Sequence, residues 1–211
     1  MTLTTERLIL RPFTMDDVEA AHRWGGNPAN VRYMFWGPNT LEGTRWFIDF
    51  VIKRAENEPR RDYDFAVVLR ETGAVIGSCG INVDGSGAMA ELGWILHLDH
   101  HKNGYGTELA AELIRFGFED LRLHRIFAPC AAVNYGSYRI MERNGMRREA
   151  THVRRFGRAL TRNGLTVRCT QFWRRNGSRD THRERSRPFR KTETSRTCAH
   201  CASVHKIMMH I

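Results

Sequence analysis

The stretch that decides the fold is ELGWILHLDHHKNGYGTELAAELIRFGFEDL, residues 91–121. Its first part alternates in the manner of a β-strand, with Trp94 and Ile95 at the centre. Its last part repeats apolar side chains at helical spacing, beginning with Leu109 and Leu113. The stretch therefore predicts a strand, a turn and a helix in succession.

The turn of this unit carries two glycines, Gly104 and Gly106. Glycine removes the Cβ atom where a backbone must come close to a ligand. The helix that begins there presents unpaired N–H groups and the positive end of its dipole. Together these features suit a pyrophosphate group, while a strand-to-helix turn that binds nothing is the alternative.

The surrounding elements predict an α+β domain with a mixed, mainly antiparallel sheet flanked by helices. Three strands follow one another through short turns, and hairpin connections of this kind make neighbouring strands antiparallel. Glycine and proline separate most of the other elements. The predicted strands cover residues 5–13, 64–70, 74–83, 91–97, 124–130 and 146–150, and the predicted helices cover residues 14–24, 41–56, 106–121 and 134–144.

The formal charge of +10 on the 211 residues is concentrated at one end of the chain. Residues 1–155 contain 20 Lys and Arg against 20 Asp and Glu, whereas residues 156–211 contain 13 against 3. We assign residues 1–155 to one domain and residues 156–211 to an atypical basic C-terminal tail. The tail shows little apolar periodicity, so we expect it to be disordered.

Three hypotheses compete for the origin of this tail. A shifted reading frame that replaces the last strand is one, because residues 167–177, if encoded by GC-rich codons, can be re-read one base earlier as an apolar strand. A basic arm that contacts RNA or the ribosome through phosphate groups is the second. The third is a zinc site, which rests on a lone CxxC pattern. Its ligands would be Cys198, His200, Cys201, His205 and His210.

Composition also bears on the compartment. No stretch reaches the ~18 apolar residues of a membrane span, and the start of the chain lacks a secretory signature. The five cysteines are an odd number without regular spacing, which favours a reducing compartment. We therefore expect a cytoplasmic protein without a membrane partner. No metal site is predicted at His97, His100 and His101, because they have no fourth ligand.

Four motifs occur in a fixed order along the first part of the chain. They are TERLILRPFTMDD at residues 5–17, ELGWILH at 91–97, GYGTEL at 104–109 and NYGSYRIMERNGM at 134–146. In combination they resemble the GNAT acetyltransferase superfamily and, within it, the Rim-type ribosomal-protein N-terminal acetyltransferases. The resemblance covers about residues 3–150 and implies an acetyl-CoA-dependent acyltransferase.

The resemblance also implies where acetyl-CoA binds. The pantetheine arm would enter a splay between the strands at 91–97 and 124–130. Backbone N–H groups from Ile95 to Leu98, His97 included, would polarise the thioester carbonyl. His101 stands where the superfamily has Gln or Arg, and we expect tolerance because the phosphate contacts are mostly main-chain. The pyrophosphate would be held by the N–H groups of Lys102, Asn103, Gly104, Tyr105, Gly106 and Thr107.

Acetyl transfer to an amine needs a neutral amine, a polarised carbonyl and a proton for the departing thiolate. Glu91 is the candidate base. Strand alternation puts it on one face with Gly93, which leaves open space beside the carboxylate. A surface or salt-bridged strand carboxylate is the alternative role of Glu91.

The candidate acid is Ser137, which the resemblance to the Rim-type branch suggests. Many superfamily members have a tyrosine at the position of Met141, which cannot donate a proton. The resemblance makes Asn134 a contact to the pantetheine arm, although asparagine also suits a plain helix cap, and both roles can hold together. Tyr135 and Tyr138 are reserve donors.

These features predict an N-acetyltransferase that moves an acetyl group from acetyl-CoA to a primary amine. A protein or peptide α-amino group is the favoured acceptor. The alternatives are an enzyme that acetylates a small amine, and a CoA-binding protein that is inactive because the last strand is missing.

Overall fold

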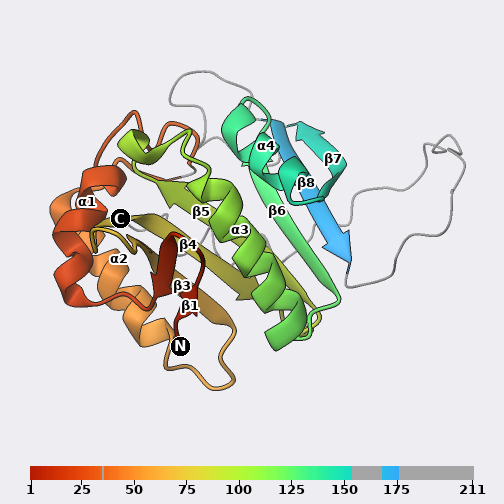
Figure 1. Cartoon of the computed structure of the whole chain (residues 1–211), viewed down its shortest axis with the longest axis horizontal. Helices are drawn as coiled ribbons and strands as arrows, with labels where there is room; N and C mark the ends of the chain where they lie inside the picture. Colours follow the sequence, from red (N-terminus) through yellow and green to blue (C-terminus); the bar gives the residue numbers. More distant parts are fainter. Residues whose placement is uncertain (35, 154–167, 176–211) are drawn as a thin grey trace, which may run out of the picture.

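The computed structural model describes residues 1–34, 36–153 and 168–175. An eight-stranded sheet has the order β1-β2-β3-β4-β5-β6-β8-β7 and is flanked by helices (Figure 1). The strands are β1 Leu3–Thr4, β2 Leu8–Arg11, β3 Asp62–Leu69, β4 Val75–Val83, β5 Met89–Leu96, β6 Arg125–Ala131, β7 Arg147–Val153 and β8 Arg168–Arg175. The main helices are α1 Val18–Gly25, α2 Leu41–Arg54, α3 Tyr105–Arg115 and α4 Tyr135–Arg143.

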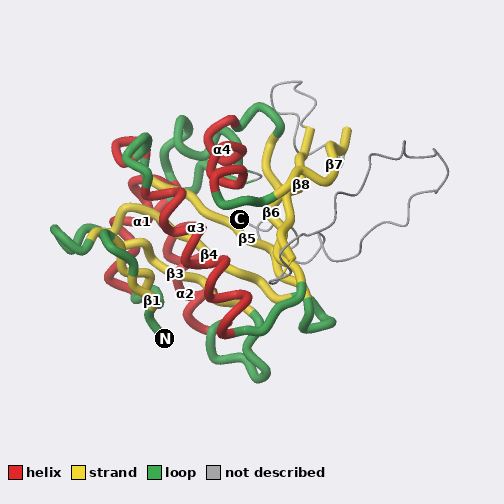
Figure 2. The backbone as a smooth tube through the Cα atoms, turned by 45° about the vertical axis from the view of Figure 1, so that its right-hand side comes forward, coloured by secondary structure: helices red, strands yellow, loops and turns green. Residues whose placement is uncertain are grey.

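Every strand pair is antiparallel except β5 and β6, which run parallel. The predicted mixed, mainly antiparallel α+β fold is therefore confirmed. Figure 2 shows β6, β8 and β7 at the end of the sheet that is opposite to β1.

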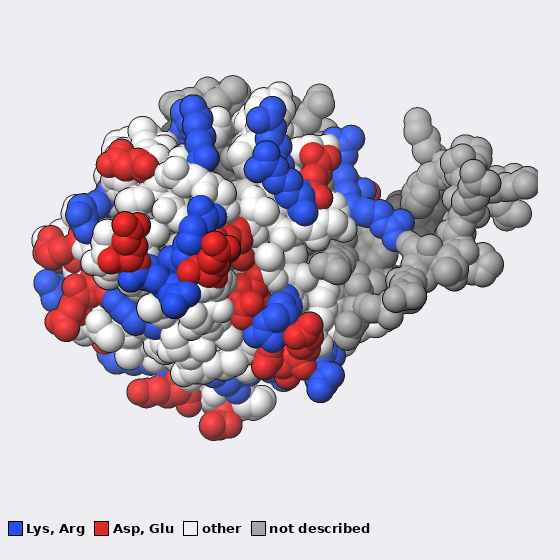
Figure 3. All heavy atoms as spheres, viewed as in Figure 1, with Lys and Arg blue, Asp and Glu red and all other residues white. Residues whose placement is uncertain are grey.

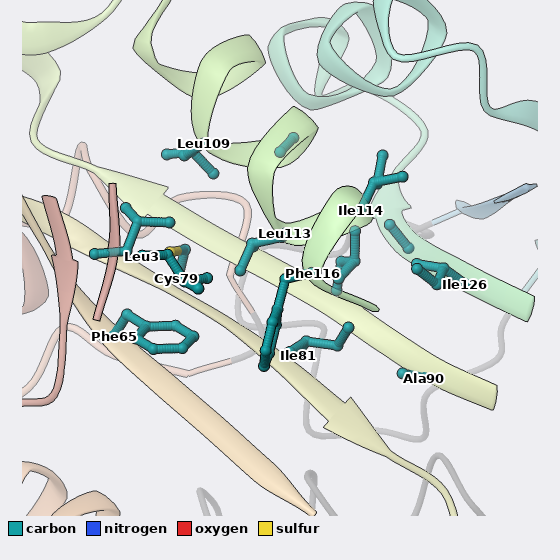
Figure 4. Packing of buried hydrophobic residues seen from close by; sticks show 14 of the residues in the cluster. Leu3, Phe65, Cys79, Ile81, Ala90, Leu109, Leu113, Ile114, Phe116 and Ile126 are labelled. Atoms are coloured by element: carbon teal, nitrogen blue, oxygen red, sulfur yellow. The ribbon is translucent and has the colours of Figure 1, made fainter. Parts of the chain in front are cut away.

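Two apolar clusters cover the two faces of the sheet. Leu109 and Leu113 of α3 pack with Phe65 and Ile81 of the central strands on one face (Figure 4). On the other face, Ile48 of α2 belongs to the second cluster, whose further members include Ala21, Trp24, Ala66 and Ile95. Strand alternation predicts this division, because successive side chains point to opposite faces.

The first predicted strand, 5–13, is divided in two by the structure. The short strand β1 pairs with β2 across a turn in which the Thr5 hydroxyl accepts from the N–H of Leu8 at 3.0 Å. At the other end of β2, Thr14 starts a helical turn as predicted, and its N–H donates to the Asp17 carboxylate at 2.8 Å. Because of the turn at Thr5, Glu6 and Arg7 belong to neither strand. The side chain of Arg7 is therefore available to contact the loop before α3.

The helix predicted over 106–121 also differs at its end. Its regular part is α3, and a π-helical turn, η3 Phe116–Asp120, continues it. Gly117 lies in this turn, where a Cβ atom would be 2.6 Å from Cδ1 of Ile126. A larger residue at this position would therefore displace the ends of the apolar side chains that pack against the turn.

A strand is present where the composition predicts disorder. β8 lies inside the basic tail 156–211 and pairs with β6 on one side and β7 on the other. The expectation of an unordered tail, and of a missing last strand, is therefore wrong for residues 168–175. The remainder of the tail, with the candidate zinc ligands, lies outside the described residues.

The surface of the body mixes both signs of charge. Figure 3 shows acidic and basic side chains interspersed over one face, in keeping with the equal numbers of each sign in residues 1–155. Across residues 1–34, 36–153 and 168–175, no helix combines the length and the apolar character that crossing a membrane requires.

Candidate active site

The parallel strands β5 and β6 separate part of the way along. Their register joins Met89 to Arg125, Ala90 to Ile126 and Glu91 to Phe127, and the pairing ends there. Beyond this point β5 keeps only β4 as its partner, while β6 continues beside β8. The described strands thus form the splay that the resemblance implies, with an unpaired edge on β5 from Leu92 onward.

The ladder between β4 and β5 determines which backbone N–H and C=O groups point to the open edge of β5. The N–H of His97 donates to the carbonyl of Ile76 at 2.8 Å. In an antiparallel pair, alternate residues turn their N–H and C=O groups toward the partner strand. Ile95 therefore faces β4, and Trp94 and Leu96 face the splay.

Because of this geometry, only one of the predicted N–H groups is left to polarise the thioester carbonyl. Of the four residues from 95 to 98, Ile95 and His97 direct their N–H groups at β4, and the N–H of Leu98 donates to the side chain of Asn30 at 2.9 Å. Leu96 is the member whose N–H points into the splay. The side chain of Ile95 is 8% exposed and packs in the cluster with α1 and α2.

The loop between β5 and α3 has the conformation of an anion-binding turn. Gly104 has φ +83° and Lys102 has φ +65°, both in the left-handed region. Within the described parts of the chain, the N–H groups of residues 102–106 donate to no other group, whereas the N–H of Thr107 donates to the carbonyl of Gly104 at 3.0 Å. Five of the six predicted N–H groups thus remain for a phosphate, and Thr107 is engaged in its own helix.

Gly106 has a different reason to be glycine from the one that the sequence suggests. A Cβ atom at Gly106 would lie 2.5 Å from Cδ1 of Ile140 on α4. The residue therefore allows α3 and α4 to pack closely. Gly104 needs to be glycine for another reason, because its left-handed φ is one that other residues adopt only at a cost.

His101, at the position where the superfamily has Gln or Arg, contacts the protein itself. Its Nε2 lies 3.0 Å from the carbonyl oxygen of Leu96, so the Nε2–H tautomer donates to the end of β5. The ring thereby ties the phosphate loop to the strand that forms the splay.

Three residues that the sequence did not single out hold the phosphate loop in place. Arg7 donates from Nη1 to the carbonyl of Asn103 at 2.9 Å, and its guanidinium lies 4.7 Å from the centre of the Tyr105 ring. Its Nε also donates to the Glu108 carboxylate at 2.7 Å. Glu108 accepts further from the Thr5 hydroxyl at 2.6 Å and from the N–H of Arg7 at 2.8 Å. We call Thr5, Arg7 and Glu108 the loop clamp.

The ionised form of Glu108 is favoured by this clamp. Burial alone would raise the pKa of its carboxyl, but the bonds from Thr5 and Arg7 outweigh burial and lower the pKa. A carboxyl whose pKa is lower in the folded protein stabilises the fold above its unfolded pKa and loses that contribution as pH falls through the folded pKa. The clamp is therefore fully formed at neutral pH and weakens in acid.

Replacing Arg7 with Gln is expected to raise the dissociation constants of CoA and acetyl-CoA equally, by about tenfold, since bonds that order the loop to a charged donor are lost. Isothermal titration with both ligands measures the effect. Arg70→Gln is the matched control, because Arg70 donates to the carbonyls of Thr5 and Glu6 in the same turn and does not contact the loop. Equal affinity in Arg7→Gln and the native protein would show that the clamp does not order the loop.

Glu91 lies half-buried on the face of β5 that also carries Gly93 and Ile95. An added Cβ at Gly93 would meet no atom within 4 Å, so the space beside Glu91 is open as predicted. Asn82 stands directly opposite Glu91 on β4 and donates to Asp62 at 3.1 Å. The predicted base is thus adjacent to a polar row of side chains.

Two aspartates on the same sheet face lie against Arg54 of α2. Asp64 forms an ion pair with Arg54, and Asp62 lies 3.6 Å from Arg54. Burial raises the pKa of the Asp64 carboxyl, and the charge of Arg54 opposes this rise. The face that carries Glu91 is therefore rich in carboxylates.

Asn134 and Ser137 form a compact unit at the start of α4. The Asn134 side chain accepts from the N–H of Ser137 at 3.2 Å, and its Nδ2 donates to the Ser137 hydroxyl at 3.1 Å. The helix-cap role of Asn134 is confirmed by the first bond. The second bond occupies a lone pair of the hydroxyl and leaves its O–H free to point elsewhere, as a proton donor requires.

The other candidate donors differ in their surroundings. Met141 is 1% exposed and belongs to the apolar cluster under α3. A hydrogen bond with Glu142 raises the pKa of the Tyr138 hydroxyl, and Tyr135 is 70% exposed. As for metals, the described residues contain no group of three or more His, Cys, Asp or Glu side chains able to hold an ion.

The comparison with known proteins identifies the class. The sequence matches the family described as Acetyltransferase (GNAT) domain over residues 7–147. The chain therefore belongs to the GNAT acetyltransferase family and is an acetyl-CoA-dependent N-acetyltransferase.

Individual relatives resemble the chain over most of their length. One is the uncharacterized N-acetyltransferase YnaD of Bacillus subtilis, 31% identical over 149 residues, which are 71% of this chain and 84% of the relative. A GNAT-family acetyltransferase from Bacillus anthracis is similar in structure, with a TM-score of 0.71, 27% identity and coverage of 83% and 98%. A putative ribosomal-protein-serine acetyltransferase from Vibrio cholerae has a TM-score of 0.69, 26% identity and coverage of 83% and 97%.

Proposed function

We propose that the protein acetylates a primary amine, with the N-terminal α-amino group of a protein or peptide as the preferred acceptor. The observation that supports a binding site for acetyl-CoA, the acetyl donor, is the open edge of β5 beside the loop at 102–106, whose N–H groups donate to no other group among the described residues. The acceptor half is supported by the likeness, at 26% identity, to the putative ribosomal-protein-serine acetyltransferase.

Acetyl-CoA supplies an activated acyl group, and the residues of this chain bind and orient it. The N–H groups of residues 102–106 bind the pyrophosphate, where the dipole of α3 favours negative charge. The edge groups of Trp94 would pair with the amides of the pantetheine arm, and Asn134 at the start of α4 would contact the same arm. Ile95, His97 and His101 then support the site through packing and backbone contacts.

The chemical step uses three groups of the chain. Glu91 accepts a proton from the amine, directly or through water, as the nitrogen attacks the carbonyl carbon. The N–H of Leu96 stabilises the carbonyl oxygen as it gains negative charge. When the C–S bond breaks, the Ser137 hydroxyl passes a proton to the thiolate and takes one from water, so that no serine alkoxide is left. An α-amino group has a pKa of ~7.7 to 8.0 against ~10.4 for lysine, so a weak base is sufficient.

A small cationic amine is the second candidate acceptor. Glu91 itself offers a carboxylate to a positively charged molecule, whereas Asp62 and Asp64 on the same face already pair with Arg54. A spermidine N-acetyltransferase from Vibrio cholerae has the same fold at 20% identity and a TM-score of 0.69. Fold alone does not identify an acceptor.

The hypothesis of an inactive CoA-binding protein depended on a missing last strand. Because β8 closes the edge of β6, that argument loses its basis. Titration with acetyl-CoA, followed by thiol release over N-terminal peptides and polyamines, tests the proposed function. We expect binding, and thiol release with peptides above that with polyamines. The reverse order would favour the small-amine enzyme, and binding without release on any acceptor would contradict both.

Replacing Ser137 with Ala is expected to lower kcat about tenfold with little change in the KM for acetyl-CoA. The loss is smaller than the ~100-fold at the low end for a general acid, because a thiol with a pKa of ~8.5 also leaves as the unprotonated thiolate. Steady-state thiol release measures both constants. Ser137→Thr should recover activity, and Tyr135→Phe is the control for a general loss of hydroxyl groups on α4. If Tyr135→Phe lowers kcat and Ser137→Ala does not, the acid is the tyrosine.

A further inference from the structure

The side chain of Asn30 joins the connection between α1 and α2 to the end of β5. Asn30 is 9% exposed. Its Nδ2 donates to the carbonyl of Leu96 at 2.9 Å, and its Oδ1 accepts from the N–H of Leu98 at 2.9 Å. Only one orientation of the amide satisfies both bonds, since a carbonyl needs a donor and an N–H needs an acceptor.

These two bonds occupy consecutive positions on the unpaired edge of β5. Along this edge the order of groups is the N–H and C=O of Trp94, the N–H and C=O of Leu96, and then the N–H of Leu98. Asn30 takes the last two, as a residue of a neighbouring strand would. The edge available to a ligand therefore ends at the N–H of Leu96.

His101 also binds the backbone at Leu96, where the open edge of β5 ends. Its Nε2 shares the Leu96 carbonyl oxygen with Asn30, at 3.0 Å. The carbonyl is thus held from the phosphate loop and from the connection between α1 and α2 at once. Two bonds to one oxygen fix the backbone at Leu96 and with it the direction of the Leu96 N–H.

We infer that Asn30 is a positioning residue that makes the Leu96 N–H the hydrogen-bond donor to the thioester carbonyl. This inference rests on the proposed function, because it concerns the carbonyl of bound acetyl-CoA. A donor that stabilises developing negative charge acts best when it is already oriented before reaction. The buried amide of Asn30 supplies this orientation without contacting the substrate. It also occupies the next groups along β5, so that the Leu96 N–H is the last one open to the thioester.

The test uses Asn30→Asp with Asn27→Asp as its matched control. Both variants add a carboxylate to the same connection. The side chain of Asn27 accepts from the N–H of Ala29, at 3.0 Å, and aspartate retains that bond. At Asn30, aspartate still accepts from Leu98 but cannot donate to Leu96.

The first readout is the ¹³C chemical shift of the carbonyl of bound [1-¹³C]acetyl-CoA, which needs no acceptor. We expect a downfield shift on binding to the native protein and to Asn27→Asp, and a smaller shift in Asn30→Asp. The second readout is affinity. The ratio of the acetyl-CoA to the CoA dissociation constant should rise about threefold to tenfold in Asn30→Asp, as for one lost hydrogen bond. The kcat should fall about 10- to 100-fold.

A carbonyl shift and an affinity ratio in Asn30→Asp equal to the native values would overturn the inference. An equal loss of CoA and acetyl-CoA affinity would overturn it too, because the residue would then serve the phosphate loop. If Asn30→Asp does not fold, Asn30→Leu carries the same test, since leucine has nearly the same shape and cannot donate to Leu96. Failure of the native protein to bind acetyl-CoA would be a different outcome, which removes the proposed function itself.

Discussion

Replacing Glu91 with Gln is expected to lower kcat for acetyl transfer about 100-fold, the lower end of the range for loss of a general base. Glutamine has the same shape but accepts no proton, so the dissociation constant of acetyl-CoA should stay within about twofold, as for an unaltered contact. Glu91 lies beside the open space over Gly93, where an amine can approach the end of the splay.

Thiol release under saturating acetyl-CoA and titration of acetyl-CoA measure the two effects separately. Glu71→Gln, in the exposed turn between β3 and β4, is the isosteric control and should have native kinetics. An unchanged kcat in Glu91→Gln would mean that Glu91 is a structural strand carboxylate, the alternative that the sequence leaves open.

Replacing Gly77 with Ala is expected to destabilise the protein by about 3 kcal/mol, the upper part of the range for overpacking. Gly77 stands directly opposite Leu96 in the ladder between β4 and β5. A Cβ atom there would lie 2.2 Å from the carbonyl oxygen of Ile95 and 2.9 Å from Cα of Leu96. These are backbone atoms, so the strands themselves must move, and the Leu96 N–H moves with them.

Denaturant unfolding measures the free energy, and acetyl-CoA titration measures the damage to the splay. Gly93→Ala is the control on the next strand, because its Cβ would meet nothing within 4 Å. It should change the unfolding free energy by less than about 1 kcal/mol. Native stability in Gly77→Ala would show that β4 and β5 can separate at this point without cost.

The sequence predicted those parts of the site that depend on local pattern. Alternation placed Glu91 and Gly93 on one strand face, and the glycines at 104 and 106 marked the turn before α3. Both features are set by backbone geometry over a few residues. The resemblance added the splay, which no local pattern contains because β5 and β6 are joined through α3.

Contacts between distant residues were missed. Arg7 and Glu108 are 101 positions apart, and Asn30 and Leu96 are 66 apart. Arg7, Glu108 and Asn30 are polar residues in a loop or a first helical turn, where polar residues are common, and their partners cannot be read from the local sequence. Gly106 shows the converse case, since a glycine beside a phosphate loop can be required by helix packing instead.

The tail was misjudged over residues 168–175 because composition counts apolar side chains and ignores the backbone. β8 has a partner on each side, so its N–H and C=O groups are paired along the ladders with β6 and β7. Backbone pairing of this kind does not depend on an apolar sequence.

The position of β8 has a consequence for folding during synthesis. β8 is the last strand of the described chain, yet it lies between β6 and β7, which are made earlier. Until residue 175 has left the ribosome, β6 has an open edge and β7 has no neighbour in the sheet. Exposed edges of this kind pair readily with other chains. The nascent protein is therefore most prone to aggregate in the interval between the synthesis of β7 and the insertion of β8.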